Sequence, residues 1–477
     1  MTIKVKTMKY ILFLLFFLIC LSQIRSQNLE SEMIFPDTLR SIKDSFYVMS
    51  PQFDKIYSQL ITKEDTFNLG TAGYKGVYMK IWTDIDTIII PHVNYPLDQL
   101  LKIPVVSPRD TSMCILRFQG NSSNFNDKYL SLAKGKYKIE IPEVYELANI
   151  ILYLSQCSNG TGNYPSSEYA NRVKIFFNAY KDHRLIQVLN NNCKSDKIWN
   201  TYYGFRENSI CFQFENGLLQ YNTPYKHVYW DQSQINGGQF RNLLYLVQDF
   251  ADRSNFQKFY SENINYYTKL VQRQYQLLPI EKIWKWLENE FPQKMQSYKI
   301  LFSPLISGSH STQKFYTGFW GEPEFVENVM FINSPEGIDL KNELSEIIKE
   351  GLISGIVFTE IDHNYVNPTS SENIVSIKEL LKEKNFWAIA EAQKNYSSEY
   401  AIFNEYMTHS LFCIYVKENY KLSDANDIIK ERVKLMVKRG FPKFDEFNKV
   451  LSNILKNRTK TVYELYPEII NQMQSIK

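Results

Sequence analysis

The hydrophobic pattern of this chain changes its period close to Pro142, and this change limits the folds that are open to it. Before Pro142, short segments rich in β-branched and aromatic residues alternate with Gly, Asn, Asp and Pro, which is typical of strands. After it, apolar residues recur three and four positions apart, which predicts helices. The predicted fold class is therefore α+β, with a β-rich N-terminal module at residues 27–140 and a mostly helical domain with a small sheet at residues 141–477.

The same patterns predict the individual elements. The predicted strands are residues 74–82, 87–91, 113–118, 137–141, 209–214, 218–222, 298–305 and 328–333, and Asn216-Gly217 is the turn of a hairpin. The predicted helices are residues 37–46, 144–155, 168–180, 184–190, 237–275, 280–291, 340–349, 355–366, 374–382, 399–415, 425–439, 445–457 and 462–473.

The first 26 residues have the features of a secretory signal peptide. Three lysines precede an apolar run at residues 10–21, which is too short to span a membrane. Small and polar residues follow, and Ser26 suits the position before a cleavage at Gln27. No second long apolar run follows, so we expect a periplasmic or extracellular protein without a membrane span.

The charge of the mature chain gives no reason to expect a nucleic-acid partner. Residues 1–26 contain four basic and no acidic residues, so the totals of 54 and 51 become 50 and 51. A nearly neutral chain lacks the basic surface that binds phosphate backbones.

Five cysteines remain after the predicted cleavage, and their spacing does not suggest a metal site. They are widely separated and contain no C-x-x-C pair, so a zinc ribbon is not predicted. One disulfide among Cys157, Cys193 and Cys211 is compatible with an oxidising compartment. Buried free thiols are the alternative.

The stretch from Gly355 to Pro368 contains a near match to a zinc-peptidase signature. In H-E-x-x-H, two histidines on one helix face hold zinc and the glutamate activates water. Here Glu360 is at the position of the catalytic glutamate and His363 at that of the second histidine. Thr359 is at the position of the first histidine. Pro368 predicts that this helix ends at the preceding residue. A buried Glu–His pair without a functional role is the structural alternative.

A second helix, at residues 399–415, contains the other candidate ligands. Zinc peptidases of the gluzincin type take their third ligand from a glutamate on a later helix. Glu405 lies in an otherwise apolar segment, where a carboxylate needs a partner. His409 is one helical turn further on, so the two can also pair with each other.

With these residues in place, the chain resembles an uncharacterised family of secreted bacterial proteins whose signature is H-E-F-x-H-x-x-V-N-P. Its members are predicted gluzincin-like zinc metallopeptidases. The resemblance covers residues 141–477 and includes the segments 141–149, 180–183, 254–260, 301–305, 365–368 and 463–469. It implies that Glu360 is the catalytic base, His363 the second zinc ligand and Glu405 the third. Thr359 departs from the pattern at the first ligand.

This departure leaves several functions open. A threonine hydroxyl is a poor substitute for imidazole on zinc, so the chain is either a pseudo-peptidase that binds extended peptide or an active peptidase with a rebuilt set of His363, Glu405 and His409. Substrate pairing in gluzincins uses a strand near the active helix, for which residues 298–305 or 328–333 are candidates. An envelope structural protein that uses aromatic surfaces of residues 237–291 is a third possibility.

The remaining histidines have weaker patterns around them. His310 follows a predicted strand and is expected to lie in an exposed loop, and His183 is expected to pair with Asp182. His92 and His227 have no recognisable partner pattern.

Overall fold

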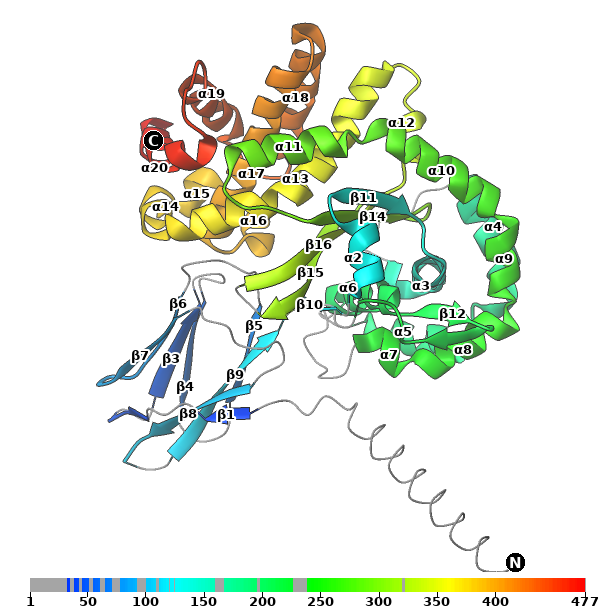
Figure 1. Ribbon diagram of the computed structural model, residues 1–477, viewed down its shortest axis with the longest axis horizontal. Coiled ribbons are helices and arrows are strands. Elements are labelled where there is room, and N and C mark those ends of the chain that lie inside the picture. Colours follow the sequence, from blue (N-terminus) through cyan, green and yellow to red (C-terminus); the bar gives the residue numbers. More distant parts are fainter. Residues whose placement is uncertain are drawn as a thin grey trace, which may run out of the picture.

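The computed structural model has α+β architecture, which confirms the predicted class (Figure 1). It describes residues 32–34, 38–42, 45–50, 55–60, 65–70, 78–91, 100–108, 111–119, 121–123, 125–158, 167–194, 198–225, 238–319 and 322–476. The predicted signal peptide, His92 and His227 lie outside these ranges. In the part of the chain that is described, no helix combines the length and the apolar character that crossing a membrane requires.

The N-terminal strands form two sheets. The first contains β1 (Glu32–Ile34), β8 (Leu100–Val106), β9 (Thr111–Gln119) and β5 (Asp65–Gly70) in that order, with β2 (Leu39–Arg40) also paired to β8. The second contains β4 (Lys55–Leu60), β3 (Ser45–Ser50), β6 (Tyr78–Trp82) and β7 (Thr87–Pro91), all antiparallel. The strands predicted at residues 74–82, 87–91 and 113–118 are therefore confirmed where they are described.

The helix predicted at residues 37–46 is wrong, because β2 and β3 occupy this segment. Carboxylates of a nearby turn accept hydrogen bonds from backbone N–H groups that a helix would have used. Asp86 accepts from the N–H of Arg40 at 2.7 Å, and Asp84 accepts from the N–H of Ile42 at 2.9 Å. The backbone is thus satisfied in an extended form.

The C-terminal part is organised around a five-stranded sheet with the order β10 (Asn121–Ser122), β15 (Ser311–Phe319), β16 (Glu322–Asn333), β14 (Ser297–Ser303) and β11 (Lys136–Glu140). The strands β11, β14 and β16 are parallel, whereas β15 is antiparallel to β16. The strands predicted at residues 137–141, 298–305 and 328–333 are confirmed. The polar segment that forms β15 has too few apolar residues to predict a strand.

The helices of this part have the following bounds: α2 (Asp127–Ala133), α3 (Glu143–Leu154), α4 (Glu168–Phe177), α5 (Arg184–Asn192), α6 (Ile198–Asn208), α7 (Gly238–Asn242), α8 (Leu244–Arg253), α9 (Phe256–Glu262), α10 (Ile264–Leu277), α11 (Ile280–Glu290), α12 (Glu336–Asp339), α13 (Glu346–Glu372), α14 (Ile374–Leu380), α15 (Lys384–Trp387), α16 (Ala390–Asn395), α17 (Glu399–Asn419), α18 (Leu422–Lys438), α19 (Phe444–Ile454) and α20 (Val462–Met473). A hairpin of β12 (Gln213–Glu215) and β13 (Leu218–Gln220) turns at Asn216-Gly217, as predicted.

Helices cover both faces of the five-stranded sheet. On β14, Tyr298 bonds to Tyr365 of α13 and packs edge-on against Trp284 of α11. On β16, Phe331 packs against Tyr145 of α3. Phe331 is in register with Leu301, and successive side chains of a strand point to opposite faces, so α3 lies on the face opposite α11 and α13. The C-terminal part is therefore layered, helix over sheet over helix (Figure 1).

The helix that carries the zinc-peptidase signature is longer than predicted. It does not end before Pro368 but continues to Glu372, so Glu360 and His363 lie in its interior. A proline inside a helix costs about 3 kcal/mol. Two hydroxyl groups stabilise the turn around it, because Thr369 donates to the carbonyl of Tyr365 and Ser371 to that of Asn367. The buried packing of this turn overrides the local preference of proline.

The long helix predicted at residues 237–275 is divided into α7, α8, α9 and α10. The break before α9 occurs at Asn255, whose φ of 55° is left-handed and ends a right-handed helix. Apolar spacing continues across these breaks, which is why periodicity alone predicts one element.

Neither strand predicted to pair with substrate lies at an edge of the sheet. The strand at residues 298–305 is β14, which pairs with β11 and β16, and the strand at 328–333 is β16, which pairs with β14 and β15. Their backbone groups are therefore used within the sheet. The antiparallel strand near α13 is β15.

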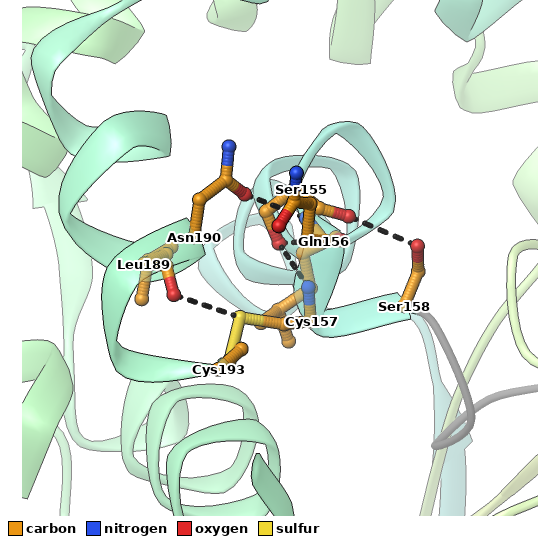
Figure 2. The surroundings of a disulfide bond; sticks show 8 residues. Ser155, Gln156, Cys157, Ser158, Leu189, Asn190 and Cys193 are labelled. Carbon is orange, nitrogen blue, oxygen red and sulfur yellow. Dashed lines mark hydrogen bonds between the residues drawn. A yellow bond between two sulfur atoms is a disulfide. The ribbon is translucent and has the colours of Figure 1, made fainter. Parts of the chain in front are cut away.

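A disulfide joins Cys157 to Cys193 (Figure 2). Cys211 is buried and lies outside this disulfide. The disulfide connects the end of α3 to the end of α5. Beside it, the backbone N–H of Gln156 donates to the side chain of Asn190 at 2.6 Å, so the same two helix ends are joined twice. Of the alternatives left open for the cysteines, one disulfide among Cys157, Cys193 and Cys211 is the one that the structure has.

Because the carboxyl of Glu146 on α3 is buried, we expect the free energy of unfolding to depend on pH. This carboxyl accepts a hydrogen bond from Tyr169 at 2.7 Å, and burial raises its pKa to about 7. In the unfolded chain it ionises near pH 4.5, so stability is lost as the pH rises from about 4.5 to about 7. We expect Glu146→Gln to be about 3 kcal/mol more stable than the wild type at pH 8, and equally stable at pH 4.

Urea unfolding followed by circular dichroism at pH 4 and pH 8 measures this difference. The exposed Glu168 provides the matched control, and Glu168→Gln should leave the pH dependence unchanged. Equal stability of Glu146→Gln and the wild type at pH 8 contradicts the prediction.

Candidate functional site

The candidate residues lie on α13 and α17, which pack side by side in the helical layer (Figure 1). Both helices begin with a serine cap, in which Ser345 accepts from the N–H of Ile348 and Ser398 from that of Ala401. Most residues of both helices are buried on all sides, so their polar side chains need partners within the protein.

A third helix, α18, approaches α13 at a glycine. A Cβ atom on Gly355 would lie 1.9 Å from the guanidinium of Arg432 and 2.7 Å from the ring of Phe412. Only glycine leaves room there for the arginine. The glycine thus allows a charged side chain from α18 to lie one helical turn before Thr359.

Glu360, His363 and Glu405 are brought together, as the sequence predicts. The Nε2 atom of His363 lies 3.6 Å from Oε1 of Glu405. Two ligands bound to one tetrahedral zinc, with bonds of about 2.1 Å, lie roughly 3.4 Å apart. His363 and Glu405 therefore keep the spacing of two zinc ligands, and Glu360 contributes to the same electrostatic environment.

Thr359 does not take part in this arrangement. Its hydroxyl lies 2.9 Å from the carbonyl of Ile356 and 3.2 Å from that of Gly355, and donates within its own helix. Back-bonding of this type is the usual state of a threonine inside a helix. The hydroxyl at the position of the first ligand is therefore bonded within its own helix, and a neutral hydroxyl is a poor zinc ligand.

His409 is close to Glu405, but it approaches the other carboxylate oxygen. Its Nε2 lies 3.4 Å from Oε2 of Glu405, whereas His363 faces Oε1. Both ring nitrogens of His409 also face arginines, Nδ1 facing Arg432 at 3.0 Å and Nε2 facing Arg439 at 2.6 Å. A neutral imidazole has one acceptor nitrogen, so only one arginine donates to it at a time.

Burial and the neighbouring arginines decide the charges of Glu405 and His409. Burial alone would raise the pKa of Glu405, but the positive charge of Arg439 and the hydrogen bond from His363 hold it well below its usual value. Burial lowers the pKa of His409 to about 3, so it is neutral and forms no ion pair with Glu405. Arg439 forms an ion pair with Glu405, at 2.7 Å from Oε2, and His363 is the second cationic neighbour, at 3.6 Å from Oε1.

The pKa values of His363 and Glu360 are both raised, but for different reasons. Burial acts to lower the pKa of His363, but Glu405 outweighs it and raises this pKa to about 9. Asn367 holds the ring from the other side, with 3.1 Å between Nδ1 and its side-chain oxygen. Burial raises the pKa of the Glu360 carboxyl to about 7, and the charge of Glu405 adds to this shift.

The donor atoms at this site do not fit a bound zinc ion. A histidine ligand needs an unprotonated nitrogen facing the metal, and both nitrogens of His409 face arginine N–H groups. Glu405 already has a cationic partner in Arg439. Consistent with this, the side chains of the described ranges contain no group of three or more His, Cys, Asp or Glu that is arranged to hold a metal ion.

Two other histidines differ from their predicted surroundings. His183 does not pair with Asp182, because it caps α5 and its Nε2 lies 2.9 Å from Asp249 on α8. His310 is partly buried rather than exposed. Burial lowers its pKa to about 4, and the charges of Arg206, Arg432 and Arg439 add to this effect.

The residues that sequence reasoning missed are Arg432, Arg439 and Tyr396. Arg439 donates to both Glu405 and the hydroxyl of Tyr396. An arginine at a buried position of an amphipathic helix is a signal for such a cluster, but its partner on another helix is not visible in the chain order.

No family model, curated protein or solved structure matches this chain. The features that bear on function are therefore the geometry of the site and the resemblance of its residues to the gluzincin signature.

Proposed function

We propose that this chain is an exported, gluzincin-like pseudo-peptidase that binds extended peptide without hydrolysing it. In this proposal the β-rich N-terminal strands form a separate module, and the helical domain is the descendant of a zinc peptidase that has lost its metal. The observation that carries the proposal is the 3.6 Å spacing of His363 and Glu405 beside a Thr359 that is turned into its own helix.

The loss of the metal is supported by the charges around Glu405. In a zinc peptidase, the metal neutralises the ligand carboxylate and activates water. Here the guanidinium of Arg439 neutralises Glu405, at 2.7 Å. The buried carboxylate is therefore stable without a metal ion.

The binding of extended peptide is supported by the arrangement of the sheet. In gluzincins, a strand near the active helix pairs with the substrate backbone, which is a form of strand addition. The strand β15 contacts α13 and runs antiparallel to its neighbour β16. On its other side, β15 pairs with β10 at Phe315 and Tyr316. We assign this role to the preceding residues of β15, Ser311 to Lys314, in place of β14 and β16, which are paired on both sides.

Export is supported by the disulfide between Cys157 and Cys193, because disulfides persist mainly in oxidising compartments. It agrees with the signal peptide that residues 1–26 predict.

The experiment that tests the proposal combines metal analysis, binding and hydrolysis on the purified mature chain. We expect less than about 0.1 zinc per chain, where a closed site would hold one, and measurable binding of an unfolded polypeptide such as reduced, alkylated casein. We expect no cleavage of that polypeptide, with or without added zinc. Hydrolysis that is lost in Glu360→Gln would contradict the proposal.

The second candidate function is an active zinc peptidase with the rebuilt ligands His363, His409 and Glu405. One observation favours it, namely that both histidines lie within 3.6 Å of the Glu405 carboxylate. It requires about one zinc per chain in the wild type, lost in His409→Ala. It also requires Arg439 to leave Glu405, because the two now form an ion pair.

A further inference from the structure

Behind the candidate site, Glu405 and His409 form a cluster with two arginines, Arg432 and Arg439. This cluster contains more positive than negative charge. Arg432 and Arg439 are charged at neutral pH, although burial lowers the pKa of Arg432 to about 10. Arg439 pairs with Glu405, but no Asp or Glu among the described residues lies within 4.0 Å of the Arg432 guanidinium. One buried cation therefore lacks an anionic partner.

Arg432 also has unused hydrogen-bond donors. An arginine has five N–H groups, and the one recorded acceptor for Arg432 in the described part of the chain is Nδ1 of His409. The side chain is nonetheless almost completely buried, with 6% of the residue exposed, and its guanidinium lies over the Phe412 ring at 4.6 Å. A buried charge with few hydrogen bonds is costly, and an anion that accepts from it recovers part of that cost.

The cluster is open to solvent on one side. Arg439 has 31% of its side chain exposed and His363 has 26%, whereas Glu405 and His409 behind them have 8% and 5%. Arg432 and Arg439 face the same imidazole, that of His409. They face its two different ring nitrogens, so a ligand bound at Arg439 lies across the imidazole from Arg432.

We propose that Arg432 and Arg439 form an anion subsite that binds a carboxylate of the peptide, with Arg439 at its entrance and Arg432 at its base. The inference rests on the proposed peptide-binding function and names the ligand group that the site selects. A carboxylate matches the planar fork of a guanidinium and accepts two N–H bonds from it. The carboxylate is either the C-terminus of the peptide or an acidic side chain near its end.

The test measures the affinity of three fluorescein-labelled peptides of one sequence by fluorescence anisotropy. One has a free C-terminus, one an amidated C-terminus, and one an amidated C-terminus preceded by aspartate. We expect a carboxylate to improve binding to the wild type by about tenfold or more over the amide. The aspartate peptide distinguishes a side-chain carboxylate from a terminal one.

The variants are Arg432→Met and, as matched control, Arg253→Met on the distant α8. Because Arg432 has no carboxylate partner, Arg432→Met should fold and unfold thermally within about 2 °C of the wild type. It should bind the free-acid and amidated peptides equally, while Arg253→Met should keep the preference. If Arg432→Met fails to fold, Arg432→Lys replaces it and should weaken the preference several-fold, since lysine keeps the charge but not the fork.

Equal affinity of the wild type for all three peptides overturns the anion subsite and leaves the proposed function standing. If no peptide binds, the proposed function has failed, and N-acetylglycine against N-acetylglycinamide then tests the subsite alone. Thermal stabilisation of the wild type by the acid but not the amide, absent in Arg432→Met, supports the subsite. No difference between the two compounds overturns it.

Discussion

Thr359→Histidine is expected to convert this chain into a zinc-binding protein with about one metal ion per chain. The substitution places an imidazole one helical turn before His363, on the same face of α13. His363 and Glu405 already have the spacing of two ligands on one metal. At a free zinc concentration of about 100 times the dissociation constant, the folded variant should gain about 2.7 kcal/mol of stability.

Metal analysis after dialysis and thermal unfolding with and without zinc measure this gain. Thr359→Gln is the matched control, because it is of similar bulk to histidine but is a poor zinc ligand. Combining Thr359→His with His363→Ala should remove the metal again. A folded Thr359→His variant that takes up no zinc would show that His363 and Glu405 are not the remainder of a metal site.

Arg439→Ala is expected to destabilise the fold by about 3 kcal/mol, which is the lower end of the range for breaking a buried ion pair. The substitution removes the guanidinium from the buried carboxylate of Glu405 and leaves His363 at 3.6 Å and the neutral His409 at 3.4 Å. Arg439→Lys should lose less, because it keeps the charge but not the bonds to both His409 and Tyr396.

Urea unfolding at pH 7 measures the loss, and Arg253→Ala serves as the matched control. Arg253 also pairs with a carboxylate, Asp249, but 67% of its side chain is exposed, so its loss should cost at most about 1 kcal/mol. The double variant Arg439→Ala with Glu405→Ala should recover part of the stability. Equal stability of Arg439→Ala and Arg253→Ala contradicts the assigned pairing.

Much of the secondary structure could be predicted because it depends on local patterns. The apolar spacing of residues 462–473 predicts α20 with the bounds that the structure has, and the helices at residues 144–155 and 280–291 are displaced by no more than one residue. The Asn216-Gly217 turn depends on two residues that tolerate positive φ, and both have it.

The failures have long-range causes. Pro368 stops a helix in isolation, but here the buried turn around it makes the helical form favourable. The strand β15 has little apolar pattern of its own and exists because β16 pairs with it along its length. Neither effect is encoded within a window of neighbouring residues.

The sequence by itself determined which residues can take part in the candidate site, because ligand spacing within one helix follows from the helical repeat. Glu360 and His363 could be named on that basis, whereas Glu405 is named from the resemblance to the gluzincin arrangement. Only the tertiary structure decided how these residues are neutralised. Arg439 reaches Glu405 and Arg432 reaches His409 from another part of the chain, and Gly355 leaves the space that Arg432 occupies. Electrostatic pairing acts across distance in space and not along the chain, so the pairing of Glu405 with a guanidinium becomes visible only when α13, α17 and α18 are packed together.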